Sequence, residues 1–221
     1  MEKKEIFRDT KNWYVNIEKY ASPNLINFAT GYAGNRILDL GCATGEYCVK
    51  LENLGFKCIG IDINPQYIEK ARQNGVEAYV MEADNLKFPD YFFDTVLLFE
   101  VLEHINNPLK VLKEAKRVSR KNILITVPNC TQFSDLRASG LTYEHMLEKD
   151  HINFFTKNDL ENLISKEFKN FEVKEKEPVW LNQLLIASGL PGWLRFPILL
   201  FNKIKLYKTK LYNRLYAVIE L

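Results

Sequence analysis

The stretch RILDLGCATGEY, residues 36–47, constrains the fold of this chain more than any other. The apolar run before its first glycine, Gly41, is interrupted only by Asp39, and a second glycine follows at Gly45. Residues 47–54 then carry apolar side chains at helical spacing. This order predicts a buried strand, a glycine-rich turn and a helix. Glycines in the turn would let its backbone approach a ligand closely.

A second apolar run, residues 58–61, ends at Asp62, which lies 21 residues after Gly41. An acid at this separation, at the tip of the next strand, accepts hydrogen bonds from ribose hydroxyls in nucleotide-binding α/β folds. The dinucleotide fingerprint G-x-G-x-x-G would require glycines at positions that Ala43 and Glu46 occupy. The sequence therefore predicts a ligand with a ribose but without a pyrophosphate.

Predicted strands and helices alternate along most of the chain, which predicts crossover units and a parallel sheet. Right-handed crossovers place the loops after the strands along one edge of such a sheet, where ligands bind. The run at 94–99 is too continuously apolar for a solvent-facing strand, so we expect it to be buried on both faces. The expected strands cover residues 36–40, 57–62, 76–81, 94–99, 123–127, 171–177 and 216–221.

Helix starts are marked by specific residues. A capping residue followed by proline occurs at Ser22, Asn64 and Asn107. Thr156 and Asp159 have the spacing of a capping box. We therefore expect helices to begin at these four places.

The motif LDLGCATGEY, together with Asp62, resembles the first motifs of the class I S-adenosylmethionine (SAM) methyltransferases. The resemblance implies an α/β, Rossmann-like, seven-stranded and mostly parallel sheet with helices on both faces. A seventh, antiparallel strand inserts beside the sixth in that family. The resemblance is most specific at 36–104 and 150–164, and it implies SAM as the cofactor.

Domain organisation follows from this resemblance. We expect one methyltransferase domain over residues 1–221, with an N-terminal helical arm at 1–34 and a helical lid insertion at 178–214.

The four cysteines form no C-x-x-C pair, and residues 1–5 carry no apolar signal segment, so a reducing, cytoplasmic location is expected.

The resemblance also implies roles for residues around the glycine-rich turn. Asp62 would accept hydrogen bonds from both ribose hydroxyls, and Asp39 would reach the amino group of the cofactor. Asp84 would accept from the adenine amino group, although an acid in an ordinary turn is the alternative. The expected cofactor-binding residues are Asp39, Gly41, Cys42, Gly45, Asp62, Ile63, Ala83, Asp84, Asn85 and Phe99.

The segment EVLEH, residues 100–104, places Glu100, Glu103 and His104 on one helical face or turn just after the fourth strand. It resembles the same segment of ubiquinone-type O-methyltransferases. It also resembles the E-x-x-E-H motif of small-RNA 3′-end 2′-O-methyltransferases, in which a further histidine completes a divalent metal site. His151 would supply that histidine here.

Two chemistries remain open for this cluster. Glu100, Glu103, His104 and His151 could hold Mg²⁺ or Mn²⁺, ions that mixed carboxylate and imidazole ligands suit when water or substrate completes the shell. Alternatively, His104, His151 and Glu100 act as acid–base groups without a metal, because an imidazole titrates near neutral pH.

The expected function is methyl transfer from SAM to a hydroxyl of a small-molecule, glycan or lipid-linked acceptor. The alternatives are a metal-assisted RNA 3′-terminal 2′-O-methyltransferase and a catalytically inactive SAM-binding regulatory module. A net charge of +2 gives no general case for nucleic acid, and the (D/N/S)PP(Y/F) motif of exocyclic-amine methyltransferases is absent.

The predicted lid could contact a membrane surface. It is rich in tryptophan and leucine, and four lysines at 203, 205, 208 and 210 follow. Proline, glycine and Arg195 break it too often for a confident membrane span. We expect an apolar helical lid or a dimer surface, and the membrane-facing patch is the alternative.

Overall fold

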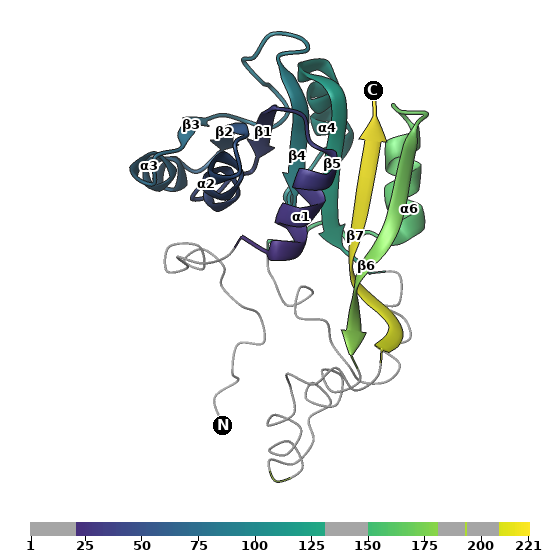
Figure 1. Ribbon diagram of the computed structural model, residues 1–221. Coiled ribbons are helices and arrows are strands. Elements are labelled where there is room, and N and C mark those ends of the chain that lie inside the picture. The colour runs from purple at the N-terminus through teal and green to yellow at the C-terminus, as the bar shows by residue number, and fades with distance from the viewer. Residues whose placement is uncertain (1–20, 131–149, 181–192, 194–207) are drawn as a thin grey trace, which may run out of the picture.

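The computed structural model describes residues 21–130, 150–180, 193 and 208–221 (Figure 1). In these residues a seven-stranded sheet has the order β3-β2-β1-β4-β5-β7-β6. Strand β7 is antiparallel to both of its neighbours, β5 and β6, and the other pairs are parallel. The predicted Rossmann-like fold with an inserted antiparallel seventh strand is therefore confirmed.

The elements alternate as the sequence predicts. The strands are β1 (Arg36–Leu40), β2 (Lys57–Asp62), β3 (Glu77–Val80), β4 (Phe93–Phe99), β5 (Ser119–Pro128), β6 (Phe171–Trp180) and β7 (Lys208–Glu220). The helices are α1 (Pro23–Tyr32), α2 (Glu46–Asn53), α3 (Pro65–Gln73), α4 (Pro108–Val118) and α6 (Lys157–Ser165), with a short 3-10 helix at Leu102–His104.

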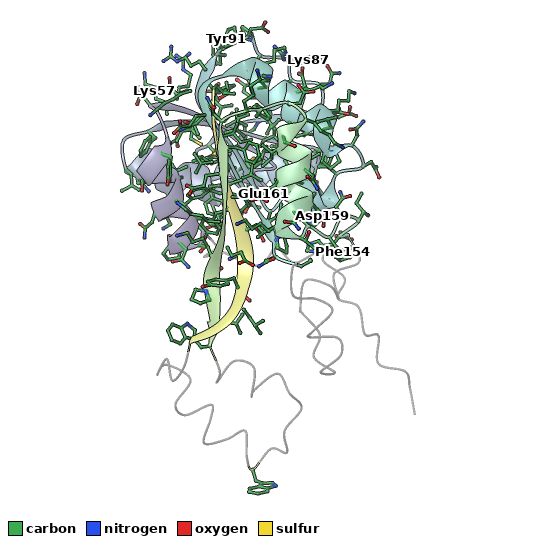
Figure 2. All side chains as sticks on the ribbon, turned by 90° about the vertical axis from the view of Figure 1, so that its right-hand side faces the viewer. Lys57, Lys87, Tyr91, Phe154, Asp159 and Glu161 are labelled. Atoms are coloured by element: carbon green, nitrogen blue, oxygen red, sulfur yellow. The ribbon has the colours of Figure 1, made fainter. Side chains whose placement is uncertain are left out.

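Helices cover both faces of the sheet. Alternate residues of each strand point to opposite faces, and since the central strands are mostly apolar, both faces must be buried. Ile37 of β1 packs in a cluster with residues of α1, α2 and α3, whereas its neighbour Leu38 packs with residues of α4 and α6. Every residue of β4 is buried, as predicted for a central strand. Figure 2 looks onto the edge of the sheet formed by β6, beside which α6 lies with Asp159 and Glu161 near its start.

The caps at the helix starts follow the prediction with one exception. The side chains of Asn64 and Asn107 each accept a hydrogen bond from a backbone N–H of the following turn. Thr156 and Asp159 form the reciprocal capping box. Ser22 makes no side-chain cap, so the proline that follows it is the remaining start signal of α1.

The last two strands are longer than predicted. Strand β6 continues to Trp180, and β7 begins at Lys208 rather than near residue 216; the two strands pair over this length. Both ends of the predicted helical lid, 178–180 and 208–214, are therefore strand, because this pairing satisfies their backbone hydrogen bonds. Pro178 is tolerated because β6 is an edge strand.

Several predictions on the chain's outer parts fall outside the described residues. They concern the first part of the N-terminal arm, residues 1–20, and the lid at 181–192 and 194–207. In the part of the chain that the structure describes, no helix is both long and apolar enough to cross a membrane.

A buried polar network joins the end of α1 to the centre of the sheet. The Thr95 hydroxyl donates to the Asn122 side-chain oxygen at 2.6 Å, and the Asn122 amide donates to the Tyr32 carbonyl at 2.7 Å. The backbone N–H of Gly34 donates to the Thr95 hydroxyl at 2.9 Å. This network fixes the chain that leads into β1.

We expect Asn122→Ala to lower the free energy of unfolding by about 1–3 kcal/mol, because it removes the acceptor of the buried Thr95 hydroxyl and one of the two donors to the Tyr32 carbonyl. The exposed Asn53→Ala, at the end of α2, serves as the matched control and should change it by less than about 0.5 kcal/mol. Urea unfolding followed by circular dichroism measures both. Equal effects of the two substitutions would show that the network adds nothing to stability.

Candidate active site

The glycine-rich turn after β1 has the geometry that its glycines predict. Gly41 and Gly45 both have a φ of 81°, in the left-handed region. The backbone N–H groups of Gly41 and Cys42 donate to the Ile61 carbonyl at 2.8 and 2.9 Å, so the turn is tied to β2. A methyl group added at Gly41 would lie 2.6 Å from a methyl of Val101. Only glycine fits there, because the turn packs directly on the segment after β4.

Asp62 is held at the end of β2 beside this turn. Its Oδ2 accepts from the Ala43 N–H at 3.0 Å and its Oδ1 from the Asn64 N–H at 2.8 Å. Burial raises the pKa of Asp62. Each carboxylate oxygen keeps further acceptor capacity, so a pair of ribose hydroxyls fits this fixed carboxylate. The next residue, Ile63, is a largely exposed apolar side chain.

Asp39, near the end of β1, is almost completely buried beneath the turn. It is 2% exposed, and the Cys48 thiol lies 3.6 Å from its Oδ2. Burial raises the pKa of Asp39 to about 7, against a smaller lowering by the Cys48 thiol. The side chain of Cys42 is also buried, in the cluster below α2 and α3. Cys42 therefore offers a ligand its backbone rather than its thiol.

The predicted adenine-binding residues lie in the loop after β3. Asp84 forms an ion pair with Lys110 of α4, with 3.0 Å between Oδ2 and Nζ. The Asn85 side-chain oxygen accepts a hydrogen bond from Lys87 at 2.8 Å. Ala83 packs at the border of the core. Sequence reasoning missed both lysines. Lys110 is distant in sequence and belongs to another element, so no local signal indicated its contact with Asp84.

Phe99, the last residue of β4, belongs to an aromatic cluster between the sheet and α1. Its ring is stacked on Phe28 at 5.9 Å and meets Tyr47 edge-on at 5.5 Å, measured between ring centroids. It is 6% exposed. The predicted contact of Phe99 with the cofactor thus remains a prediction, and its observed role is packing.

Two segments far apart in the sequence, 100–105 and 150–155, meet after β4. The backbone N–H groups of Ile152 and Asn153 donate to the Glu103 carbonyl at 2.9 and 3.0 Å. The Asn153 amide donates to the carbonyls of Leu102 and Ile105 at 2.9 and 2.7 Å. These bonds fix the position of His151 relative to the 3-10 helix.

Glu103, His104 and His151 form a group whose potential ligand atoms all lie within 4.8 Å of one another. The two imidazole rings are 4.7 Å apart and nearly perpendicular. The Nδ1 of His104 lies 3.0 Å from the Asp150 carbonyl. A carbonyl only accepts, so Nδ1 carries the proton in this contact and Nε2 of a neutral His104 is basic. Such a group can take a proton or bind a divalent cation.

Glu100 does not join this group. It has a left-handed φ of 56°, and its Oε2 lies 3.2 Å from Nε of Arg214 in β7. Arg214 also pairs with Glu177 of β6, whose other oxygen accepts from the Tyr216 hydroxyl at 2.7 Å. The structure therefore brings together three of the four predicted metal ligands and places Glu100 in a separate ion-pair network.

The Arg214 network links the residue after β4 to the β6–β7 pair beside the end of β5. Burial lowers the pKa of Arg214, but the charges of Glu100 and Glu177 outweigh this effect and raise it. Among the described residues, Glu100 Oε1 is a buried atom without a hydrogen-bond partner. Sequence reasoning missed Arg214 because it placed residue 214 in the lid rather than in β7.

The raised pKa of Asp39 makes stability depend on pH. Between about pH 4 and pH 7 the folded chain holds a proton on Asp39 that the unfolded chain releases, so stability falls as pH rises through this window. We expect the unfolding free energy of Asp39→Asn, relative to wild type, to rise by on the order of 2 kcal/mol from pH 5 to pH 8.

Urea unfolding at both pH values measures this difference. Glu69→Gln, on the exposed side of α3, is the matched control and should track wild type at both pH values. A difference between Asp39→Asn and wild type that stays constant from pH 5 to pH 8 would contradict the assignment.

Comparison with known proteins gives a consistent picture. The family model described as "Methyltransferase domain" matches residues 15–175. An uncharacterized protein of Methanocaldococcus jannaschii is 31% identical over 145 residues, covering 63% of this chain and 67% of that protein. The human probable tRNA methyltransferase 9B is 28% identical over 116 residues, covering 52% of this chain but 25% of that protein.

Two further comparisons concern a biosynthetic enzyme and a solved structure. The 27-O-demethylrifamycin SV methyltransferase of Amycolatopsis mediterranei is 32% identical over 97 residues, covering 40% of this chain and 36% of that protein. A SAM-dependent methyltransferase from Archaeoglobus fulgidus superposes with a TM-score of 0.70 at 17% identity, covering 95% of this chain and 97% of that chain. This chain therefore has the fold of a SAM-dependent methyltransferase and belongs to the methyltransferase domain family.

Proposed function

We propose that this protein transfers the methyl group of SAM to a hydroxyl oxygen of a small-molecule, glycan or lipid-linked acceptor. The observation that carries the proposal is the His104 imidazole, whose Nδ1 is fixed by the Asp150 carbonyl at 3.0 Å. It lies three residues after Val101, on which the glycine-rich turn packs. A base is thus held close to the turn that would carry the cofactor.

The residues around the turn fit SAM, whose sulfonium supplies an already activated methyl group. Asp62 is a fixed double acceptor suited to the ribose hydroxyls. The loop with Asp84 and Asn85 would bind the adenine ring, and the buried Asp39 would face the amino group. The left-handed φ of Gly41 and Gly45 sets the path of the turn, and the absence of their side chains lets it pack against Val101 and Val76.

The protein's remaining task is to orient an oxygen nucleophile and to accept its proton. Nε2 of His104 is the basic atom of the fixed imidazole, and His151 lies beside it. The hydrogen bonds from Asn153 to the turn at 102–105 hold both histidines in place. Oxygen acceptors agree with the name of the rifamycin methyltransferase, which specifies a 27-O position.

One observation favours a second function, metal-assisted 2′-O-methylation at the 3′ end of RNA. The ligand atoms of Glu103, His104 and His151 lie close enough together to share a divalent cation. The similarity to the probable tRNA methyltransferase 9B is compatible with an RNA substrate. The nearly neutral net charge of +2 speaks against it.

The contact of the lid with a membrane surface stays a prediction. A catalytically inactive SAM-binding module is the third candidate. It would bind S-adenosylhomocysteine (SAH) but transfer no methyl group to any acceptor.

We expect His104→Ala to lower the rate of methyl transfer from tritiated SAM at least about 100-fold, because it removes the general base. The affinity for SAH should stay within about threefold of wild type, since His104 is not assigned to the cofactor. The measurement uses a panel of phenol, catechol, glycan, quinol and RNA 3′-end acceptors. An unchanged rate with the best acceptor would exclude His104 as the base.

Titration of Mn²⁺ and Mg²⁺ in the presence of SAH separates the first two functions. If wild type binds metal and His104→Ala does not, the three-residue group is a metal site and diol acceptors, including RNA 3′ ends, become the leading substrates. If neither binds metal while wild type binds SAH, His104 and His151 act as acid–base groups.

A further inference from the structure

We infer that Arg117, in the last turn of α4, is a positioning residue that sets the preference of the cofactor site for adenine over other purines. The inference rests on the proposed function, because it assumes that the loop with Asp84 and Asn85 binds the purine ring. Arg117 does not touch that ring in this account. It acts by fixing the loop that does.

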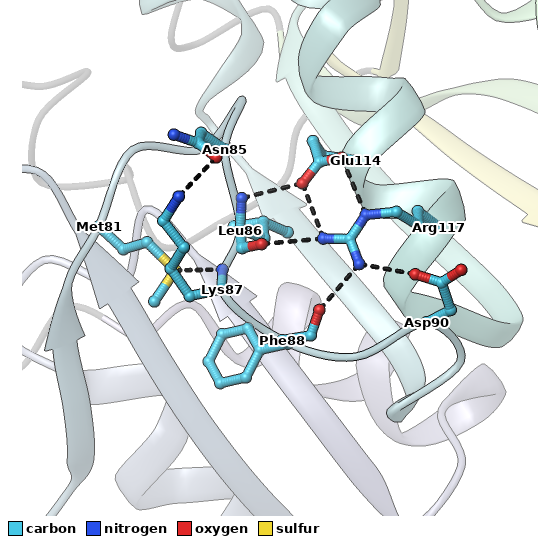
Figure 3. Close-up of polar contacts among 8 residues, drawn as sticks. All are labelled: Met81, Asn85, Leu86, Lys87, Phe88, Asp90, Glu114 and Arg117. Carbon is cyan, nitrogen blue, oxygen red and sulfur yellow. Dashed lines mark hydrogen bonds and ion pairs between the residues drawn. The ribbon is translucent and has the colours of Figure 1, made fainter.

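Figure 3 shows how the Arg117 guanidinium spans the loop after β3. One terminal nitrogen, Nη1, donates to the Phe88 carbonyl at 2.8 Å and pairs with Asp90 at 2.8 Å. The other, Nη2, donates to the Leu86 carbonyl at 2.9 Å. A single planar group with donors in fixed directions thus holds three successive points of the loop.

Glu114, one turn earlier on the same helix, completes the clamp. It accepts from the Leu86 N–H at 2.9 Å and holds Arg117 by two hydrogen bonds, at 3.0 and 2.9 Å. The Arg117 guanidinium lowers the pKa of Glu114, so this pair stays ionised at neutral pH. Both backbone polar groups of Leu86 are therefore fixed to α4, one residue after Asn85.

A third residue on the same face of α4, Lys110, also contacts the loop after β3. Lys110 pairs with Asp84 at 3.0 Å, and Lys110, Glu114 and Arg117 are spaced by four and three residues, which puts them on one stripe of the helix. The side chain of Leu86 is 4% exposed and packs in the core beneath the loop. The position of Asp84 thus depends on Lys110 directly, and that of Asn85 depends on the hydrogen bonds that fix Leu86, the next residue.

This placement matters because adenine and hypoxanthine differ at two neighbouring ring positions. The 6-amino group of adenine donates a hydrogen bond and its N1 accepts one, whereas the 6-oxo group of hypoxanthine accepts and its N1–H donates. An acceptor held opposite position 6 meets the 6-amino donor of adenine but faces the 6-oxo acceptor of hypoxanthine, so the hypoxanthine pairing is lost. A loop that can move lets the acceptor reach N1–H of hypoxanthine instead, so the preference is reduced.

The test compares the dissociation constants of SAH and S-inosylhomocysteine, which carries hypoxanthine, by calorimetry. We expect wild type to prefer SAH at least about tenfold, and Arg117→Met to reduce this preference below about threefold. Arg117→Lys should behave like Arg117→Met, because an ammonium group cannot reproduce the fork of the guanidinium.

Arg120→Met is the matched control. Arg120 lies three residues further on, is 61% exposed, and pairs with Asp94 away from the loop. The Arg120→Met protein should prefer SAH over S-inosylhomocysteine by the same factor as wild type. A purely structural effect of losing an arginine would weaken both ligands by the same factor and leave their ratio unchanged.

The outcomes are separable. An unchanged ratio in Arg117→Met, or a wild type that binds both ligands equally, overturns the inference. Should circular dichroism show Arg117→Met to be unfolded, Glu114→Gln decides instead, since it removes the charge of the clamp and should also lower the ratio. Failure of wild type to bind either ligand contradicts the proposed function itself.

Discussion

The structure depends on the pairing of β1 and β4 at the centre of the sheet. From this pair the chain proceeds outward in both directions, through β2 and β3 on one side and β5 on the other. The loops after β1 and β4 therefore lie next to each other at the carboxyl edge, which is where open α/β sheets bind ligands. The glycine-rich turn packs against Val101 there.

Backbone hydrogen bonds place the candidate functional groups at this edge of the sheet. Asp62 is fixed by two backbone N–H groups, and His104 by a backbone carbonyl. The segment with His151 is fixed in the same way through the carbonyl of Glu103. Such groups need little rearrangement when a ligand arrives, which is the form of preorganisation that favours catalysis by positioning.

The local part of this arrangement could be predicted from the sequence. The turn needs glycine at positive φ, the caps need Asn or Thr before a helix, and an apolar run as continuous as β4 belongs in a sheet centre. These are short-range rules, and they located the turn, Asp62 and most helix starts. The proximity of Glu103, His104 and His151 was predicted from resemblance, and the structure brings these three together.

The rest depends on pairings between distant segments that no local rule specifies. Glu100 pairs with Arg214 because β7 extends further than its apolar end indicates. Asp84 pairs with Lys110 because α4 packs next to the loop after β3. In both cases the sequence correctly predicted that the acidic residue follows a strand. The basic residue that pairs with it belongs to another element, which the sequence did not indicate.

The most direct test of the account is a calorimetric titration of SAH into wild type and Asp62→Asn. The account predicts one site in wild type and an affinity at least about tenfold lower in Asp62→Asn, because an amide offers one acceptor oxygen where the carboxylate offers two. The unfolding temperatures of the two proteins should be measured alongside, so that a loss of fold is not mistaken for a loss of contact. Equal affinities in two folded proteins, or no binding by wild type, would contradict the central claim.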